Sequence, residues 1–136
     1  MGSRTKSRRK AVEVLYEADI RGESIIDALE RVQKQGVTTY NEFTLLLLNG
    51  IAAHVSTITD VIDTYSEGWK TERMPSLDKC LAQVGVYELL YCQDIPDEAT
   101  ISEIVSLAAE MSTENSPQFL NGLLAKISSI RHRLVV

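Results

Sequence analysis

The sequence predicts an all-α protein of roughly six or seven helices and no strand. Apolar residues recur at helical spacing through most of the 136 residues. Proline is scarce, with 3 residues, and glycine is modest, with 7, which disfavours all-β and disordered chains. Hydrophobic residues make up 44% and charged residues 24% of the chain, as expected for one ordinary globular domain.

The first half of the chain predicts a long helix, a short helix and a third helical stretch. A helix over about residues 4–20 ends at a break at Arg21-Gly22. Ser24 caps the second helix and Gly36 ends it. A capping box, Thr39-x-x-Glu42, opens the third, which reaches Tyr65 with a break near Ser56-Thr57. The expected inward positions are Ala11, Val14, Leu15, Ala18, then Ile25, Ile26, Leu29, Val32, then Phe43, Leu46, Leu47, Gly50, Ile51, Ile58, Val61, Ile62 and Tyr65.

The second half predicts three further helices after a connector that contains Trp69 and lies between Gly68 and Pro75. Ser76 caps the first of them, and Ile95-Pro96 stops it. A second capping box, Thr100-x-x-Glu103, begins the next helix. Ser116-Pro117 begins the last, with proline at a first-turn position where its missing N–H costs nothing. The expected inward positions are Leu77, Leu81, Val84, Tyr91, then Ile101, Val105, Ala108, Met111, then Phe119, Leu120, Leu123, Leu124, Ile127 and Ile130.

One short echo suggests two similar halves. Leu48-Asn49-Gly50-Ile51 and Leu120-Asn121-Gly122-Leu123 both place glycine inside an amphipathic pattern. A helix-interior glycine costs about 1 kcal/mol against alanine, so close helix crossing is the expected reason for both glycines. We expect one domain over residues 1–136, with an N-terminal helical half at about 1–66 and a C-terminal half at about 69–136.

Positive charge is concentrated at the amino terminus. The first ten residues hold five cations and no anion, whereas the other residues hold 9 basic and 19 acidic side chains. Cations in the first turns of a helix oppose its dipole by a few tenths of a kcal/mol each, so a polyanionic partner is the expected reason for them. A solvated, frayed basic tail is the alternative. The five cations are Arg4, Lys6, Arg8, Arg9 and Lys10.

The sequence lacks the motifs of enzymes, cofactor sites and metal sites. No glycine-rich phosphate loop, GxSxG or HExxH pattern occurs, and His54 and His132 stand alone. Cys80 and Cys92 would lie about 18 Å apart along one helix, which favours free thiols in a reducing cytoplasm. The longest apolar run, Leu45–Leu48, is too short to span a membrane, and no signal-peptide pattern precedes it. Binding is therefore the expected function, without catalysis, cofactor or metal.

From Trp69 onward the chain resembles the NusB family of transcription antitermination factors. The order and spacing of several short segments carry the resemblance, and the first helix, with Ala11-Val12-x-x-Leu15-Tyr16, extends it to nearly the whole chain. The segments are Trp69-x-x-x-Arg73-Met74, Leu77-Asp78-Lys79, Gly85-Val86-Tyr87-Glu88-Leu89-Leu90, Asp94-Ile95-Pro96, Ile101-Ser102-Glu103-Ile104-Val105-Ser106-Leu107-Ala108 and Ser116-Pro117-x-Phe119-Leu120-Asn121-Gly122-Leu123-Leu124.

The resemblance implies an all-helical fold of two helix-bundle halves and a role in transcription. NusB proteins pair with NusE, which is also a small-subunit ribosomal protein, and bind the boxA element of ribosomal RNA leaders. The complex helps the elongating polymerase to ignore terminators in ribosomal operons. The implied partners are therefore boxA RNA and NusE, with other Nus factors and RNA polymerase contacted indirectly.

The resemblance also implies site residues. The basic first helix would contact RNA phosphates, Tyr16 would stack on or bond to a base, and the segment Met111 to Phe119 would complete the RNA site. Core packing is the alternative for Phe119. Asp78 falls on an acidic position that faces NusE, and a carboxylate favoured by the helix dipole is the alternative there. The RNA-binding candidates are Arg4, Lys6, Arg8, Arg9, Lys10, Tyr16, Asn115 and Phe119.

The chain departs from the family pattern near this site. Glu110 after Ala109 replaces a common lysine, Met111 replaces a common aromatic residue, Gln83 replaces an arginine, and Ser102 replaces an asparagine. We expect weaker RNA affinity, or more reliance on the first helix and the partner. Two other functions stay open: a homodimeric helical scaffold, and an RNA-targeting module of a ribosomal RNA methyltransferase.

Overall fold

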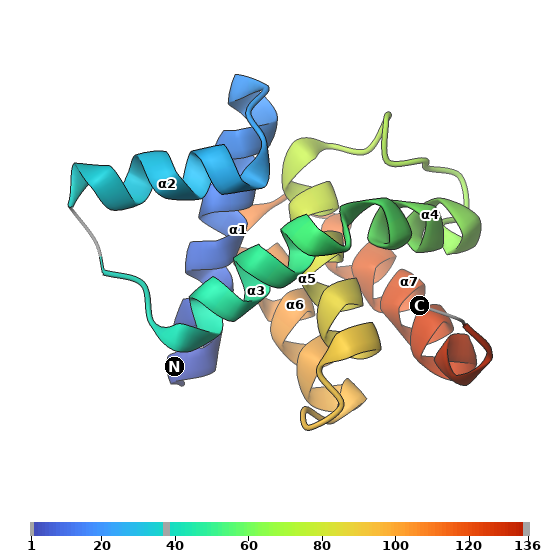
Figure 1. The fold of residues 1–136 in the computed structure, drawn as a ribbon. Coiled ribbons are helices and arrows are strands. Elements are labelled where there is room, and N and C mark those ends of the chain that lie inside the picture. Colours follow the sequence, from blue (N-terminus) through green and yellow to red (C-terminus); the bar gives the residue numbers. More distant parts are fainter. Residues whose placement is uncertain (1, 37–38, 135–136) are drawn as a thin grey trace.

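The computed structural model describes residues 2–36 and 39–134, and these form helices joined by turns and loops, with a longer loop at residues 66–75 (Figure 1). The all-α prediction is confirmed for this part of the chain, which contains seven α-helices and no strand. The helices are α1 (Ser3–Arg21), α2 (Ile25–Gln35), α3 (Glu42–Ala53), α4 (Val55–Tyr65), α5 (Ser76–Tyr91), α6 (Asp97–Met111) and α7 (Ser116–Ile130), followed by a 3-10 turn, η1 (Arg131–Arg133).

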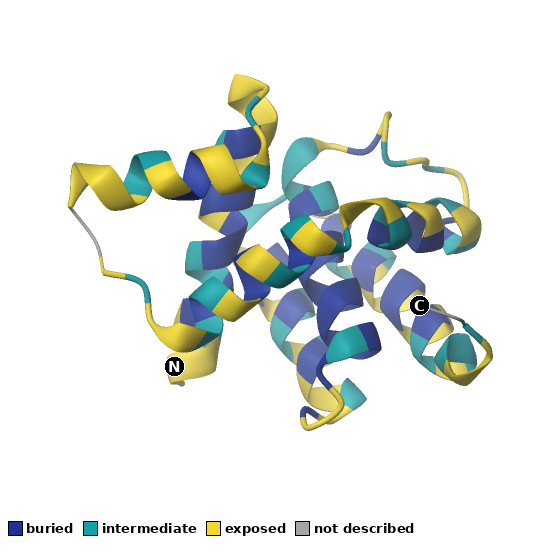
Figure 2. Cartoon of the chain, in the orientation of Figure 1, coloured by how far each residue is buried: buried dark blue, intermediate teal, exposed yellow. Residues whose placement is uncertain are grey.

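Helix α5 lies near the centre of the molecule (Figure 1). Every residue from 80 to 90 is buried, which no other helix approaches (Figure 2). Helices α1, α3, α4, α6 and α7 all pack against it, whereas α2 packs on α1 and α3 at the periphery. Because α5 contacts helices of both predicted halves, it joins them through one hydrophobic core. The division into two halves itself stays a prediction.

The helix ends agree with the sequence where the cap is local. The Ser24 hydroxyl accepts the backbone N–H of Asp27 at 3.1 Å, and Gly36 ends α2 in the left-handed region with φ 67°. Proline lies in the first turn of α7, as predicted from Ser116-Pro117. Ser76 is the first residue of α5 and not its cap, because its hydroxyl donates to Asp19 instead.

Both predicted capping boxes are wrong. Helix α3 begins at Glu42 after Asn41, whose side-chain oxygen accepts the Thr44 N–H at 3.0 Å. Helix α6 begins three residues before Thr100, directly after Pro96, whose φ of −59° already suits a helix. The Thr100 hydroxyl is buried and donates to Glu88 at 2.9 Å, so it serves a contact between helices.

The predicted break in the third helical stretch is confirmed, and it lies at His54, two residues before Ser56. His54 stacks on Tyr91 of α5, with ring centroids 4.1 Å apart, which holds the corner against the core. Among the described residues no single helix is long and apolar enough to cross a membrane. Helices α3 and α4 pass that test only as a pair, and they are bent by 78°.

Packing corrects several predicted core positions. Ile26 and Leu46 are 37% and 48% exposed, because each neighbours a residue that faces inward and successive side chains diverge by about 100° on a helix. A Cβ on Gly50 would overlap the Tyr87 ring, which confirms the close crossing expected there. Gly122 is different, because a Cβ there would meet open space. Cys80 and Cys92 are buried and free, as predicted.

Candidate nucleic-acid interface

The basic residues at the amino terminus occupy the first turns of α1, but they do not share one environment. Arg8 turns inward and is only 3% exposed. Its Nε and Nη2 donate to Oε2 and Oε1 of Glu88 at 2.7 and 2.8 Å, and Thr100 donates to the same carboxylate. This bidentate pair fixes α1 on α5 and α6. In contrast to the expectation of an RNA contact, Arg8 is a packing residue here.

Arg4 and Arg9 reach the surface, and each lies beside a carboxylate. Arg4 Nη2 is 3.7 Å from Oδ2 of Asp94, and its guanidinium lies 5.4 Å from the centre of the Phe43 ring. Arg9 forms an ion pair with Glu110 at the end of α6. These contacts lower the effective positive charge of the α1 surface, although both arginines keep substantial exposure.

Lys6 and Lys10 are the least compensated cations of this run. Lys6 is exposed and Lys10 is partly exposed. Neither ammonium lies within 4.0 Å of a carboxylate among the residues that the structure describes. Phosphates of an RNA strand would therefore meet these two lysines without first displacing an internal carboxylate.

Tyr16 lies further along α1 and lines an open groove of about 450 Å³. It is 38% exposed, so one side of its ring is available to a ligand. Leu77 at the start of α5 and Met111 at the end of α6 line the same groove, together with Tyr40. Burial raises the pKa of Tyr40, and the carboxylates of Glu13 and Glu17 raise it further. Tyr16 and Met111, distant in sequence, are thus brought together.

The segment after α6 presents Asn115 but only part of Phe119. Asn115 is exposed at the N-cap of α7, and its side chain makes no capping hydrogen bond to that helix. Phe119 is half-buried, and its ring meets Trp69 edge to face with centroids 5.3 Å apart. The packing alternative for Phe119 therefore accounts for much of its surface.

Asp78 is fully buried, at 0% exposure. Its Oδ1 accepts hydrogen bonds from Ser112 at 2.6 Å and from Ser116 at 2.7 Å, while its Oδ2 has no partner among the described residues. The carboxylate therefore ties the start of α5 to the segment between α6 and α7. In contrast to the expectation of a direct NusE contact, its side chain does not reach the surface in this conformation.

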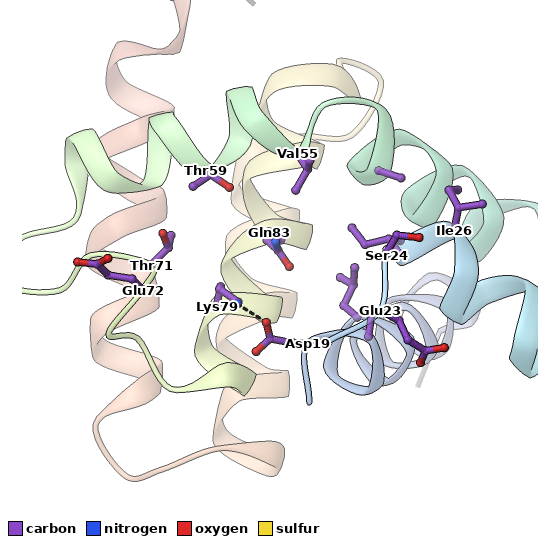
Figure 3. Close-up of a pocket in the computed structure, with 14 residues that line it drawn as sticks. Asp19, Glu23, Ser24, Ile26, Val55, Thr59, Thr71, Glu72, Lys79 and Gln83 are labelled. Carbon is purple, nitrogen blue, oxygen red and sulfur yellow. Dashed lines mark hydrogen bonds and ion pairs between the residues drawn. The ribbon is translucent and has the colours of Figure 1, made fainter. Parts of the chain in front are cut away.

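The other end of α1 borders a second open groove of about 500 Å³ (Figure 3). Asp19 accepts a hydrogen bond from Ser76 at 2.5 Å and forms an ion pair with Lys79. Burial alone would raise the pKa of Asp19, but the Lys79 and Ser76 contacts outweigh it and lower the pKa below its ordinary value. Polar contacts thus hold α1 on α5 near both ends of α1, through Arg8–Glu88 and through Asp19 with Lys79. The position of the basic first turns of α1 depends on these two sets of contacts.

Comparison with known proteins identifies the family to which this helical architecture belongs. The NusB family profile matches residues 5–129 of the chain. The chain belongs to the NusB family. Among its relatives, the transcription antitermination protein NusB of Thermobifida fusca (strain YX) is 44% identical over 126 residues, covering 93% of this chain and 89% of that protein. The protein of the same name from Nocardioides sp. is 40% identical over 127 residues, covering 93% and 94%.

Solved structures show the same NusB fold. A T. maritima NusB superposes with a TM-score of 0.82 at 29% identity, covering 98% of this chain and 99% of that one. A NusB chain solved with NusE and double-stranded RNA gives a TM-score of 0.80 at 22% identity, covering 93% and 96%. At that identity the second likeness shows the fold alone.

Sequence reasoning missed the acidic partners of the basic run. Glu103 accepts a hydrogen bond from the Thr5 hydroxyl, and Glu110 pairs with Arg9, so two carboxylates on α6 contact α1. We call these two contacts the α1–α6 seam. The two glutamates are seven residues apart, which places them on one face of a helix and was a detectable signal. What the sequence could not provide was which helix that face would meet.

Proposed function

We propose that this protein is a transcription antitermination factor that binds boxA-type ribosomal RNA leaders together with NusE. We place it in the cytoplasm and assign it no catalytic step. The observation that carries the proposal is the exposed cationic surface of α1 on an otherwise acidic chain, beside the groove shared by Tyr16 and Met111. Relatives that are about 40% identical over nearly the whole chain are named antitermination proteins, which supports it.

In this proposal the RNA contacts are divided among the candidate residues according to their exposure. Lys6 and Lys10 bind phosphates directly, and Arg4 and Arg9 join them when they leave their carboxylates. Tyr16 stacks on an unpaired base. Asn115 bonds a base edge, and Phe119 contributes the part of its ring that Trp69 leaves open. Arg8 supports the surface from within.

NusE is proposed to dock at the α5 edge of this groove, at Leu77, while Tyr16 on the α1 edge is left to the RNA base. Leu77 is partly exposed there, directly before the buried Asp78, so the start of α5 can face the partner without the carboxylate itself doing so. The structural neighbour in complex with NusE and double-stranded RNA provides a precedent for both partners on this fold. Other Nus factors and RNA polymerase would be reached through the assembled complex.

Fluorescence anisotropy of a short boxA-bearing leader RNA, with and without NusE and at two salt concentrations, tests the RNA part. We expect sequence-dependent binding that NusE tightens. Replacing both Lys6 and Lys10 by glutamine should lower the slope of log affinity against log salt by about 1.4, since each single-strand phosphate contact contributes roughly 0.7. Lys34→Gln on the exposed surface of α2 is the matched control. Equal binding to scrambled RNA in all conditions would contradict the proposal.

The NusE surface is tested by Leu77→Asp, which introduces a charge into the groove. We expect NusE binding, measured by calorimetry, to weaken by at least tenfold while the helical circular dichroism signal is kept. Leu46→Asp is the control, because Leu46 is 48% exposed and does not line this groove. Equal losses in both variants would argue against the groove. Light scattering of the free protein tests the remaining alternative, a homodimer that covers the basic surface.

A further inference from the structure

We propose that Glu110 competes with RNA for Arg9, so that the Arg9–Glu110 ion pair sets how tightly the basic surface of α1 binds RNA. The inference rests on the proposed RNA-binding function and adds a residue that opposes it. It identifies Glu110 as an affinity-determining residue that acts by occupying a phosphate-binding group.

The geometry makes this pair accessible and exchangeable. Arg9 and Glu110 are joined at the surface, with side chains 31% and 49% exposed. The neighbouring Arg8–Glu88 pair is 3% and 0% exposed, so it is closed to any ligand. An exposed ion pair contributes little free energy, and a phosphate can therefore displace the Glu110 carboxylate from Arg9. A guanidinium binds phosphate and carboxylate with the same two-pronged geometry, which makes the two acceptors direct competitors.

The position of Glu110 links it to the rest of the proposed RNA surface. It precedes Met111, which lines the groove with Tyr16, and it lies at the end of the helix that leads to Asn115. A strand that contacts both α1 and Asn115 therefore passes beside this carboxylate. On the same seam, Thr5 donates a hydrogen bond to Glu103. Binding of RNA at Arg9 thus requires loss of one internal contact and approach to a freed negative charge.

The test compares RNA affinity of the full-length protein and its E110Q, R9Q and R9Q/E110Q variants by anisotropy with a boxA-bearing leader RNA. We expect E110Q to bind about two- to fivefold tighter at low salt, which is the range of an exposed ion pair. The salt slope should steepen by up to about 0.7, since Arg9 then releases one counterion on binding. R9Q should bind more weakly than the wild type, and R9Q/E110Q should bind like R9Q.

Glu98→Gln is the matched control, since Glu98 is exposed on the same helix, carries the same charge and has no ion pair among the described residues. A similar gain from E98Q would attribute the effect to the general field and overturn the inference. So would an E110Q gain that persists in the R9Q background. If the wild type binds RNA and E110Q binds it with the same affinity, the inference is wrong while the proposed function stands. Absence of binding by every variant overturns the proposed function as well.

Discussion

The buried Arg8–Glu88 pair offers the sharpest prediction about stability. Two charge-assisted hydrogen bonds of 2.7 and 2.8 Å join the side chains, and Thr100 adds a third donor to the carboxylate. Arg8→Met would leave Glu88, at 0% side-chain exposure, with a single hydroxyl donor. Removing one partner of a buried pair costs about 3–5 kcal/mol, because the remaining charge is uncompensated. We expect a loss of that size in the free energy of unfolding.

The double variant Arg8→Met, Glu88→Met distinguishes the energy of the ion pair from the energy gained by burying two long side chains. Replacing both ions by apolar groups of similar size is often nearly neutral, although Thr100 would lose its acceptor at a cost of about 1–3 kcal/mol. The double variant should therefore be more stable than Arg8→Met alone, with a coupling energy of about 2 kcal/mol or more. Urea unfolding followed by circular dichroism measures each value.

Arg4→Met is the control for this series, because Arg4 is paired across 3.7 Å to Asp94 at an exposed position. Its effect on unfolding should stay within about 0.5 kcal/mol. A loss of less than about 1 kcal/mol in Arg8→Met would refute the reasoning. So would a double variant whose loss equals the sum of the losses in Arg8→Met and in Glu88→Met measured singly, since a coupled pair cannot behave additively.

Three further predictions concern the core and its titrating groups. Gly50→Ala should destabilise the protein by about 1–3 kcal/mol, because the new Cβ overlaps Tyr87, whereas Gly122→Ala should stabilise it by up to about 1 kcal/mol; urea midpoints that move in the same direction would contradict the packing difference. Burial raises the pKa of Cys80 from 9.0 to about 12, so the thiol should resist alkylation in the native state and the free energy of unfolding should decline as the pH rises from about 9 toward 12, because the unfolded thiol ionises first. Rapid labelling of Cys80 in the native protein at pH 8, detected by mass spectrometry, would contradict this. The lowered pKa of Asp19 means that the stability lost in Asp19→Asn should be fully expressed above its ordinary value of 3.8 and should vanish as the pH falls through the native pKa; a difference in urea midpoint that is unchanged at pH 2 would count against the ionic contact.

Local signals located the helices but not all of their ends. The Ser24 cap, the Gly36 end and the proline in the first turn of α7 agree with the structure because each involves groups within a few residues. Thr100 and Glu103 have the spacing of a capping box, yet each bonds to another helix. A side chain that can cap locally is free to bond elsewhere once packing brings a stronger partner near.

The glycine echo shows the same limit in the core. Two identical dipeptides, at residues 49–50 and 121–122, predicted two close crossings, and only Gly50 makes one. The helical period indicates which residues share a face, but it does not reveal which faces meet another helix at short range.

The all-α class, most helix positions and the concentration of positive charge at the start of α1 can be predicted from the amino-acid sequence, because periodicity, caps and charge are local properties of a chain. Which cations face solvent depends instead on contacts between distant helices. Arg8 is taken into the core by Glu88, 80 residues away, and Arg9 is paired with Glu110, 101 residues away. Partners that distant are brought together by the packing of α1 against α5 and of α5 against α6, and no pattern within one helix can specify them.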